Sequence, residues 1–124
     1  MIDDSEITNI ADGWVKYSLT EKRGDDTFFW AWERLHDLVY KEPEEAWRII
    51  ERLPQIDTSD FMLASVAAGP VEDLLCYHGE RFVDRIETLG LRDRLWRRLL
   101  GAVWKSTTPE TVWKRIKVVA GPSF

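Results

Sequence analysis

Residues 67–75 read Ala-Ala-Gly-Pro-Val-Glu-Asp-Leu-Leu, and residues 78–79 read His-Gly. Gly69 favours the left-handed backbone that ends a helix. Pro70 suits the first position of a new helix, because the N–H that proline lacks has no helical partner there. Gly79 then predicts a second helix end. The stretch therefore predicts short helices joined by tight turns.

Apolar residues at helical spacing continue on both sides of this stretch. They predict eight segments, over residues 4–19, 28–40, 43–53, 60–68, 70–79, 80–89 and 92–104 and from 109 to just before Gly121. Ser59 or Thr58 is expected to cap the segment at 60–68, and Thr108 the last one, with Pro109 at its first position. No segment alternates polar and apolar residues over strand length. The sequence therefore predicts an all-α fold, a single compact domain over 1–124 with seven to eight short helices packed as antiparallel helical hairpins.

The charge of the chain is uneven along its length. Its 124 residues carry a net charge of −5. Residues 1–62 hold 15 acidic and 7 basic side chains, a net charge of −8, whereas residues 63–124 hold 7 acidic and 10 basic ones, a net charge of +3. An acidic first half suits a partner with a basic surface.

Cysteine usage and hydropathy predict where the chain works. Cys76 is the only cysteine, so no internal disulfide can form, and a reducing compartment is expected. No apolar run is long enough to span a bilayer, and the acidic N-terminus lacks the basic start of a signal peptide. We expect a cytoplasmic protein that does not bind membranes.

Seven tryptophans are many for an interior of this size. Trp14, Trp32 and Trp96 fall on apolar stripes and are expected in the core. Trp30 lies off its stripe, and packing beneath a neighbouring helix and binding a partner explain it equally well. Together with nearby carboxylates, the remaining rings form the predicted protein-binding residues: Trp30, Glu33, Asp37, Trp47, Glu72, Asp73, Trp104 and Trp113.

Residues that suggest catalysis or metal binding have simpler explanations. Cys76 and His78 diverge by about 200° on a helix, so they cannot readily hold one ion. Glu72 and Asp73 are adjacent acids expected in the first turn of a helix, where the helix dipole favours negative charge. The alternative is that they meet a cation, such as an arginine. The sequence predicts no catalytic residue, no metal and no cofactor.

A basic stretch supports an alternative function. Arg94, Arg97 and Arg98 share the outer face of their helix, and Lys105 and Lys114 follow. Such a face would meet phosphates, although most helices of soluble proteins also keep a charged outer side.

Several motifs together resemble those of a family of small bacterial helical proteins known only as a domain of unknown function. They span roughly residues 32–115, leaving the first 27 outside. The motifs are Trp32-Glu33, Pro43-Glu44-Glu45-Ala46-Trp47, Ala68-Gly69-Pro70-Val71-Glu72-Asp73-Leu74-Leu75, His78-Gly79, Leu100-Gly101-Ala102-Val103-Trp104 and Val112-Trp113-Lys114-Arg115. The resemblance implies a bacterial helical domain and brings no activity, cofactor or site residue with it.

Three functions follow in order of preference. The first is a non-enzymatic protein-binding module, immunity-like or inhibitor-like, that engages a basic partner through an acidic, tryptophan-bearing surface. The alternative is a nucleic-acid-associated protein that uses the basic C-terminal helices. The third is an enzyme, which would need a cleft that brings together His36, His78, Glu72 and Asp73.

Overall fold

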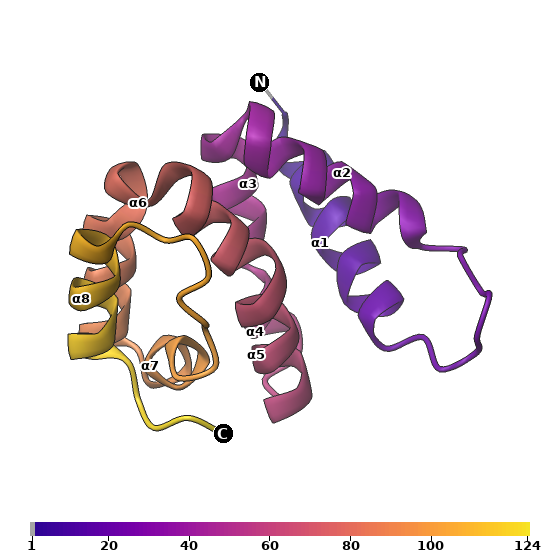
Figure 1. The fold of residues 1–124 in the computed structure, drawn as a ribbon. Coiled ribbons are helices and arrows are strands. Elements are labelled where there is room, and N and C mark those ends of the chain that lie inside the picture. Colours follow the sequence, from indigo (N-terminus) through magenta and orange to yellow (C-terminus); the bar gives the residue numbers. More distant parts are fainter. Residues whose placement is uncertain (1) are drawn as a thin grey trace. The chain divides into compact units, whose positions relative to one another are not determined.

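The computed structural model describes residues 2–124, and these contain helices and no strand (Figure 1). The all-α prediction is confirmed. The chain divides into two compact units, one that ends at Thr58 and one that begins at Ser59. The elements in chain order are α1 (Asp4–Ser18), α2 (Phe29–Lys41), α3 (Pro43–Ile50), α4 (Leu53–Ile56), α5 (Asp60–Val66), the π-helical turn η1 (Ala67–Val71), α6 (Glu72–Arg92), α7 (Arg94–Leu100) and α8 (Glu110–Val119).

In the first unit, α1 and α2 form an antiparallel hairpin, as predicted (Figure 1). Tyr17 near the end of α1 meets Phe29 at the start of α2, and Arg34 reaches back to Glu6. The two helices approach closely at Gly13, where an added Cβ would lie 2.8 Å from the Cβ of Ala31. The predicted apolar stripe of α1 is buried here: Ile7, Ile10, Ala11, Trp14 and Val15.

The short helices α3 and α4 complete this unit. Helix α3 begins at Pro43, as predicted, but ends at Ile50 rather than residue 53. Pro54 stands in the first turn of α4, where its missing N–H costs nothing. Arg48 ties α3 to the start of α1, since it donates to Asp4 at 2.6 Å, to Glu45 at 2.8 Å and to the Ile2 carbonyl at 2.8 Å.

In the second unit, the predicted stop at Gly69 and restart at Pro70 are wrong. Helix α5, η1 and α6 run on without interruption from residue 60 to residue 92, and Gly69 does not adopt a positive φ. A regular α-helix would bring the Pro70 ring against the carbonyl of Val66, four residues earlier. The wider π turn relieves that clash, so the chain passes through the proline instead of ending before it. Ser59 caps the run, because its side chain accepts from the Met62 N–H.

The predicted helix end at Gly79 and the predicted end of the next segment at residue 89, just before Gly90, are also wrong, because α6 continues through both glycines. His78 has non-helical angles (φ −137°, ψ 26°), which bend α6 without ending it. The two glycines give neighbouring helices room: a Cβ on Gly79 would lie 3.1 Å from Val112, and one on Gly90 would lie 2.9 Å from Val119. Both act as packing sites rather than as helix ends.

Helices α7 and α8 pack against α6. Helix α7 spans Arg94–Leu100, shorter than the predicted 92–104, and Asp93 caps it by accepting from the Leu95 and Trp96 N–H groups. A loop then carries the chain back along α6, so that α8 lies beside α6 and runs parallel to it (Figure 1). This pair differs from the predicted antiparallel hairpins.

The start of α8 also differs from the prediction. Pro109 takes the cap position, not the first helical one. Thr108, the predicted cap, is buried instead, and its hydroxyl lies 3.6 Å from the Cys76 sulfur. None of the helices in residues 2–124 has the length and apolar character needed to cross a bilayer.

Candidate functional site

One side of α2 carries a row of aromatic rings. Phe29, Trp32, His36 and Tyr40 recur every three or four residues, a spacing that brings side chains together on a helix. Phe29 stacks on Trp32 at 5.5 Å between ring centroids, Trp32 on His36 at 5.0 Å, and His36 meets Tyr40 edge-on at 5.0 Å. This row lies at the edge of the buried arc of α2, so much of it meets solvent.

Trp14 and Trp96 are buried, as predicted, but Trp32 is 37% exposed, so its predicted place in the core is wrong. The buried arc of α2 is narrow, consisting of Ala31, Leu35, Leu38 and Val39. Among the described elements of the first unit, α1 and α3 are the ones that pack extensively against α2. They cover that arc and leave the ring of Trp32 beside it.

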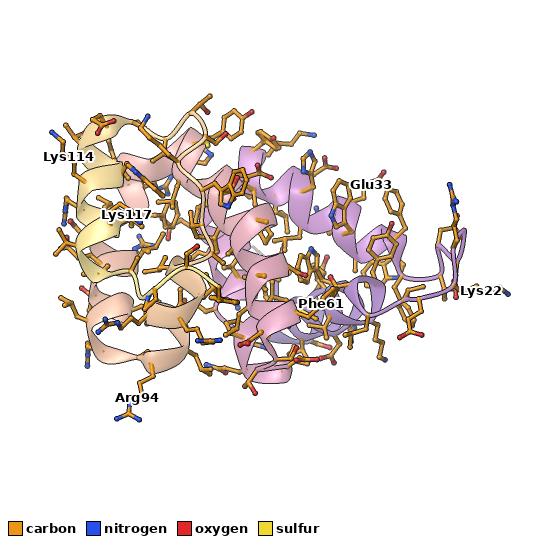
Figure 2. All side chains as sticks on the ribbon, turned by 60° about the horizontal axis from the view of Figure 1, so that its bottom comes forward. Lys22, Glu33, Phe61, Arg94, Lys114 and Lys117 are labelled. Carbon is orange, nitrogen blue, oxygen red and sulfur yellow. The ribbon has the colours of Figure 1, made fainter. Side chains whose placement is uncertain are left out.

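Three of the predicted binding residues share one exposed stripe of α2. Trp30 is 49% exposed, and Glu33 and Asp37 follow it at intervals of three and four residues. Neither carboxylate forms an ion pair with another residue in the described part of the chain. The Trp30 ring partly covers α1, since it lies 3.2 Å from the place that a Gly13 Cβ would occupy. Trp30 therefore packs against α1 with part of its ring and exposes the rest to solvent. Figure 2 marks Glu33 on the side of α2 away from α1.

Trp47 does not belong to this surface. It is only 6% exposed and lies on the buried side of α3, beside Ala46 and Ile50. Its sequence position is at the edge of an apolar stripe. An indole is wide enough to reach into the core from an edge position, so Trp47 offers no exposed ring for the predicted binding surface.

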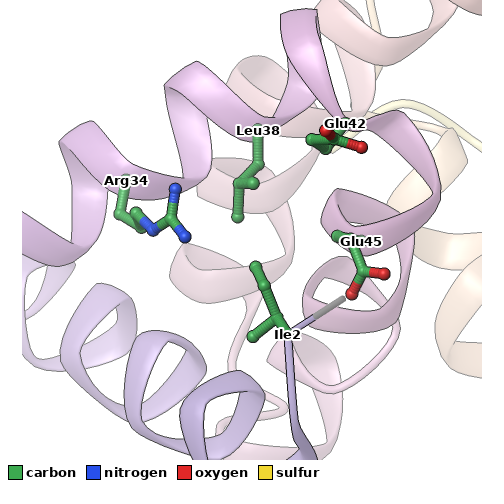
Figure 3. A pocket seen from close by; sticks show the side chains of 5 residues that line it. All are labelled: Ile2, Arg34, Leu38, Glu42 and Glu45. Carbon is green, nitrogen blue, oxygen red and sulfur yellow. The ribbon is translucent and has the colours of Figure 1, made fainter.

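A pocket of about 400 Å³ opens on the neighbouring side of α2 (Figure 3). Leu38 and Ile2 form its apolar part, with Arg34 on one side and Glu42 and Glu45 on the other. Internal ion pairs engage two of these charges: Arg34 lies 3.4 Å from Glu6, and Glu45 lies 2.8 Å from Arg48. The third charge, on Glu42, has no ion-pair partner among the described residues.

In the second unit, Glu72 and Trp104 meet as neighbours. Glu72 accepts a hydrogen bond from the Trp104 backbone N–H at 3.2 Å, while the Trp104 side chain is 76% exposed. Burial raises the pKa of Glu72, the hydrogen bond from Trp104 lowers it, and the charge of Asp73 raises it again, which leaves it above the ordinary value. Trp113 is half-buried, with the Lys117 ammonium 5.7 Å from its ring centroid.

Glu72 and Asp73 do not occupy the free helix start that the sequence predicts. The two acids follow η1 inside a continuous helical run, so the backbone N–H groups there are not those of a free helix end. The alternative of an arginine partner does not describe Glu72 either, because its hydrogen bond comes from the backbone of Trp104.

Cys76 faces the loop before α8. Burial raises the pKa of its thiol, but hydrogen bonds with Thr107, Thr108 and Ser106 outweigh that effect and leave the pKa below its ordinary value. No group of three or more histidine, cysteine or acidic side chains within residues 2–124 is arranged to hold a metal ion. The pocket of Figure 3 is lined by none of the residues considered for an enzyme, which are His36, His78, Glu72 and Asp73.

Carboxylates neutralise part of the predicted nucleic-acid surface. The Arg98 guanidinium donates hydrogen bonds to both carboxylate oxygens of Asp60, at 2.7 and 2.8 Å. The Lys105 ammonium lies 3.5 Å from a carboxylate oxygen of Glu110. Among the described residues, Arg94, Arg97 and Lys114 have no such partner. Figure 2 shows Arg94 and Lys114 pointing outward from α7 and α8.

Two parts of this site were not predicted from the sequence. Tyr40 follows Asp37 by three residues, so the spacing of Trp30, Glu33, Asp37 and Tyr40 could have identified it. The pocket could not have been found in this way, because Ile2, Arg34 and Glu45 meet there only through the tertiary fold.

Comparison with known proteins places the chain in a family. No curated protein and no solved structure matches it. The model of a family of unknown function, DUF6869, matches residues 18–123. The match extends beyond the expected span of roughly 32–115 and takes in part of the first 27 residues, and it includes α2, the π turn and α8. The chain therefore belongs to the family of unknown function DUF6869.

Proposed function

We propose that the chain is a non-enzymatic protein-binding module that engages a basic protein through the outer face of α2. One observation carries the proposal. Two carboxylates without ion-pair partners among the described residues, Glu33 and Asp37, stand between exposed aromatic side chains on one stripe of a helix. We call this stripe, made of Trp30, Glu33, Asp37 and Tyr40, the α2 ridge.

The charge of the first unit supports a basic partner. Residues 1–58 hold 14 acidic and 7 basic side chains, a net charge of −7. A field of one sign attracts a partner of the opposite sign and raises the association rate. The acids of the α2 ridge lie where that partner would dock.

The exposed rings supply the apolar part of the interface. Tryptophan and tyrosine are the residues that most often dominate binding energy, because they bury a large area at a small entropic cost. Trp30 and Tyr40 stand at the two ends of the α2 ridge, with the carboxylates between them.

An immunity-like or inhibitor-like role fits this surface. A nuclease or toxin that binds nucleic acid does so with arginine and lysine side chains that face phosphates. An acidic helix face can occupy the same cationic surface and block it. The proposal includes a bacterial, cytoplasmic setting, in which the chain would hold such a protein inactive.

Comparative affinity purification tests the proposal. The wild-type chain and the variant Trp30→Ala/Glu33→Gln/Asp37→Asn are used side by side as baits in extracts of the source cell. The proposal predicts that proteins lost with the variant are strongly basic. The strongest of them, once purified, should bind the wild-type chain as a defined complex and bind the variant at least about tenfold more weakly.

A matched control locates the interface. The variant Trp104→Ala/Glu80→Gln removes one exposed indole and one exposed carboxylate from the second unit. It should bind the same partner as the wild type does. Loss of binding in this control but not in the α2 variant would place the interface elsewhere and contradict the proposal, as would a set of lost proteins that is acidic.

A further inference from the structure

We infer that the α2 ridge recognises an arginine side chain of its partner, whose guanidinium lies between Glu33 and Asp37 and stacks on a flanking ring. The inference rests on the proposed function and identifies guanidinium as the chemical group of the partner that the surface binds. It follows from the spacing of the ridge, from the shape of guanidinium, and from two arginine sites within the second unit.

The spacing of the ridge suits one guanidinium. Glu33 and Asp37 are four residues apart, so their side chains leave the helix as neighbours. Trp30 precedes Glu33 by one turn, and Tyr40 follows Asp37 by one turn. Each carboxylate therefore has an aromatic ring beside it, and the two carboxylates together face one position in solvent.

The shape of guanidinium fits this arrangement better than that of ammonium does. Guanidinium is planar and carries five N–H donors, so it can bind carboxylates on its edge and stack on a ring with its face. An ammonium group is a compact point charge that holds its water more strongly and cannot stack. A surface that offers both carboxylates and ring faces selects arginine over lysine.

The second unit already binds an arginine between two acids of one helix. Arg115 of α8 donates to Glu87 at 2.9 and 3.0 Å and to Asp84 at 2.6 Å, and both acids belong to α6. Asp84 and Glu87 stand about one helical turn apart, as Glu33 and Asp37 do. A helix with such spacing can therefore hold one guanidinium that arrives from a neighbouring helix.

Arg98 shows the second contact, in which the face of a guanidinium lies over an aromatic ring. Its guanidinium forks onto both carboxylate oxygens of Asp60 and lies 4.4 Å from the centroid of the Phe124 ring. The edge of one guanidinium thus binds a carboxylate while its face contacts an aromatic ring. The α2 ridge presents the carboxylates and the rings of such a site without the arginine.

Peptide titrations test the inference on the full chain. Three short peptides differ only in carrying three arginine, three lysine or three citrulline residues, and citrulline has nearly the shape of arginine without the charge. Binding is followed by NMR through the Trp30 indole N–H and the α2 backbone amides. The arginine peptide should bind about fivefold more tightly than the lysine peptide, and the citrulline peptide at least about tenfold more weakly than the arginine peptide.

Variants separate the contributions of charge and ring. Glu33→Gln/Asp37→Asn should weaken binding of the arginine peptide at least about tenfold, and Trp30→Ala about threefold. The control Trp104→Ala/Glu80→Gln should change it less than about twofold. All these residues are exposed at the surface, so each variant should fold, and circular dichroism is used to check this.

The outcomes distinguish this inference from the proposed function. If the lysine peptide shifts the α2 amides as strongly as the arginine peptide does, the arginine inference is wrong while binding of basic partners at the ridge stands. If neither peptide shifts them, the arginine inference is wrong, and the fate of the proposed function is decided by the affinity purification. Shifts confined to other helices also overturn the inference.

Discussion

The two acids of the α2 ridge repel each other within the free protein. Like charges four residues apart on a helix destabilise it, and no partner from the described residues neutralises either one. Proteins often keep such unfavourable features where binding needs them, because the partner relieves them. The ridge is therefore expected to lower the stability of the free chain slightly.

This expectation gives a prediction for Glu33→Gln. The substitution removes the repulsion with Asp37 and should raise the free energy of unfolding by about 0.3 kcal/mol. Urea denaturation measures the change. Glu21→Gln, at an exposed position outside the helices, is the control and should have no effect. A loss of stability at Glu33 would mean that its charge is favourable in the free chain.

A second prediction concerns the glycines of the second unit. Gly90→Ala would place a Cβ 2.9 Å from Val119 and 3.0 Å from Leu100, so it should destabilise the chain by about 1–3 kcal/mol. Gly69→Ala meets no atom within 4 Å and should be neutral or stabilising by up to about 1 kcal/mol. Thermal unfolding of the two variants compares them. Equal effects would show that Gly90 does not serve close packing.

At the scale of elements, the sequence predicts most helices and fails where glycine or proline has two possible uses. The apolar spacing located α1, α2, α5 and α8 to within about two residues at most ends. Gly79 and Gly90 gave the signal of a helix end, but neighbouring helices need the space. Local signals cannot distinguish these uses, because the difference depends on residues that are distant in the sequence.

The parallel pair of α6 and α8 carries a pH-dependent contact. Arg115 holds the pKa of Glu87 below its ordinary value of 4.5, mainly through their hydrogen bonds. A lowered folded-state pKa means that this pair stabilises the fold above pH 4.5 and that the contribution disappears as the pH falls through the folded-state pKa.

Arg115→Gln should accordingly destabilise the chain at pH 7, and the difference from wild type should shrink as the pH falls below about 4. Denaturant unfolding at a series of pH values measures it. Arg94→Gln, which removes an arginine without a described carboxylate partner, should lack this pH dependence. A difference for Arg115→Gln that stays constant with pH would mean that the ion pair does not contribute.

At the scale of the whole molecule, the net charge of −5 opposes the nucleic-acid alternative. The candidate site was predicted in part: the sequence identified Trp30, Glu33 and Asp37, but it also assigned Trp47 to the surface and Trp32 to the core. Whether a ring on the edge of a stripe is buried depends on which helices cover it, and the spacing of residues on one helix does not contain that information.

Nucleic-acid binding is therefore expected to be absent. Fluorescence anisotropy with single-stranded and double-stranded DNA and RNA, at about 50 mM salt, should show no saturable binding, since Arg98 and Lys105 already face carboxylates. Binding that falls steeply with salt, and that Arg94→Gln/Arg97→Gln/Lys114→Gln removes, would restore this alternative.

The π turn has a consequence for chain length. An extra residue in an α-helix normally rotates everything after it by about 100°, but a π turn absorbs the surplus locally. Residues 67–71 can thus be regarded as an accommodated insertion. Excising Pro70 should let residues 60–77, up to the bend at His78, close as an ordinary helix, with the faces on both sides of residue 70 still in phase. Excising Ser65 should turn one buried face towards water.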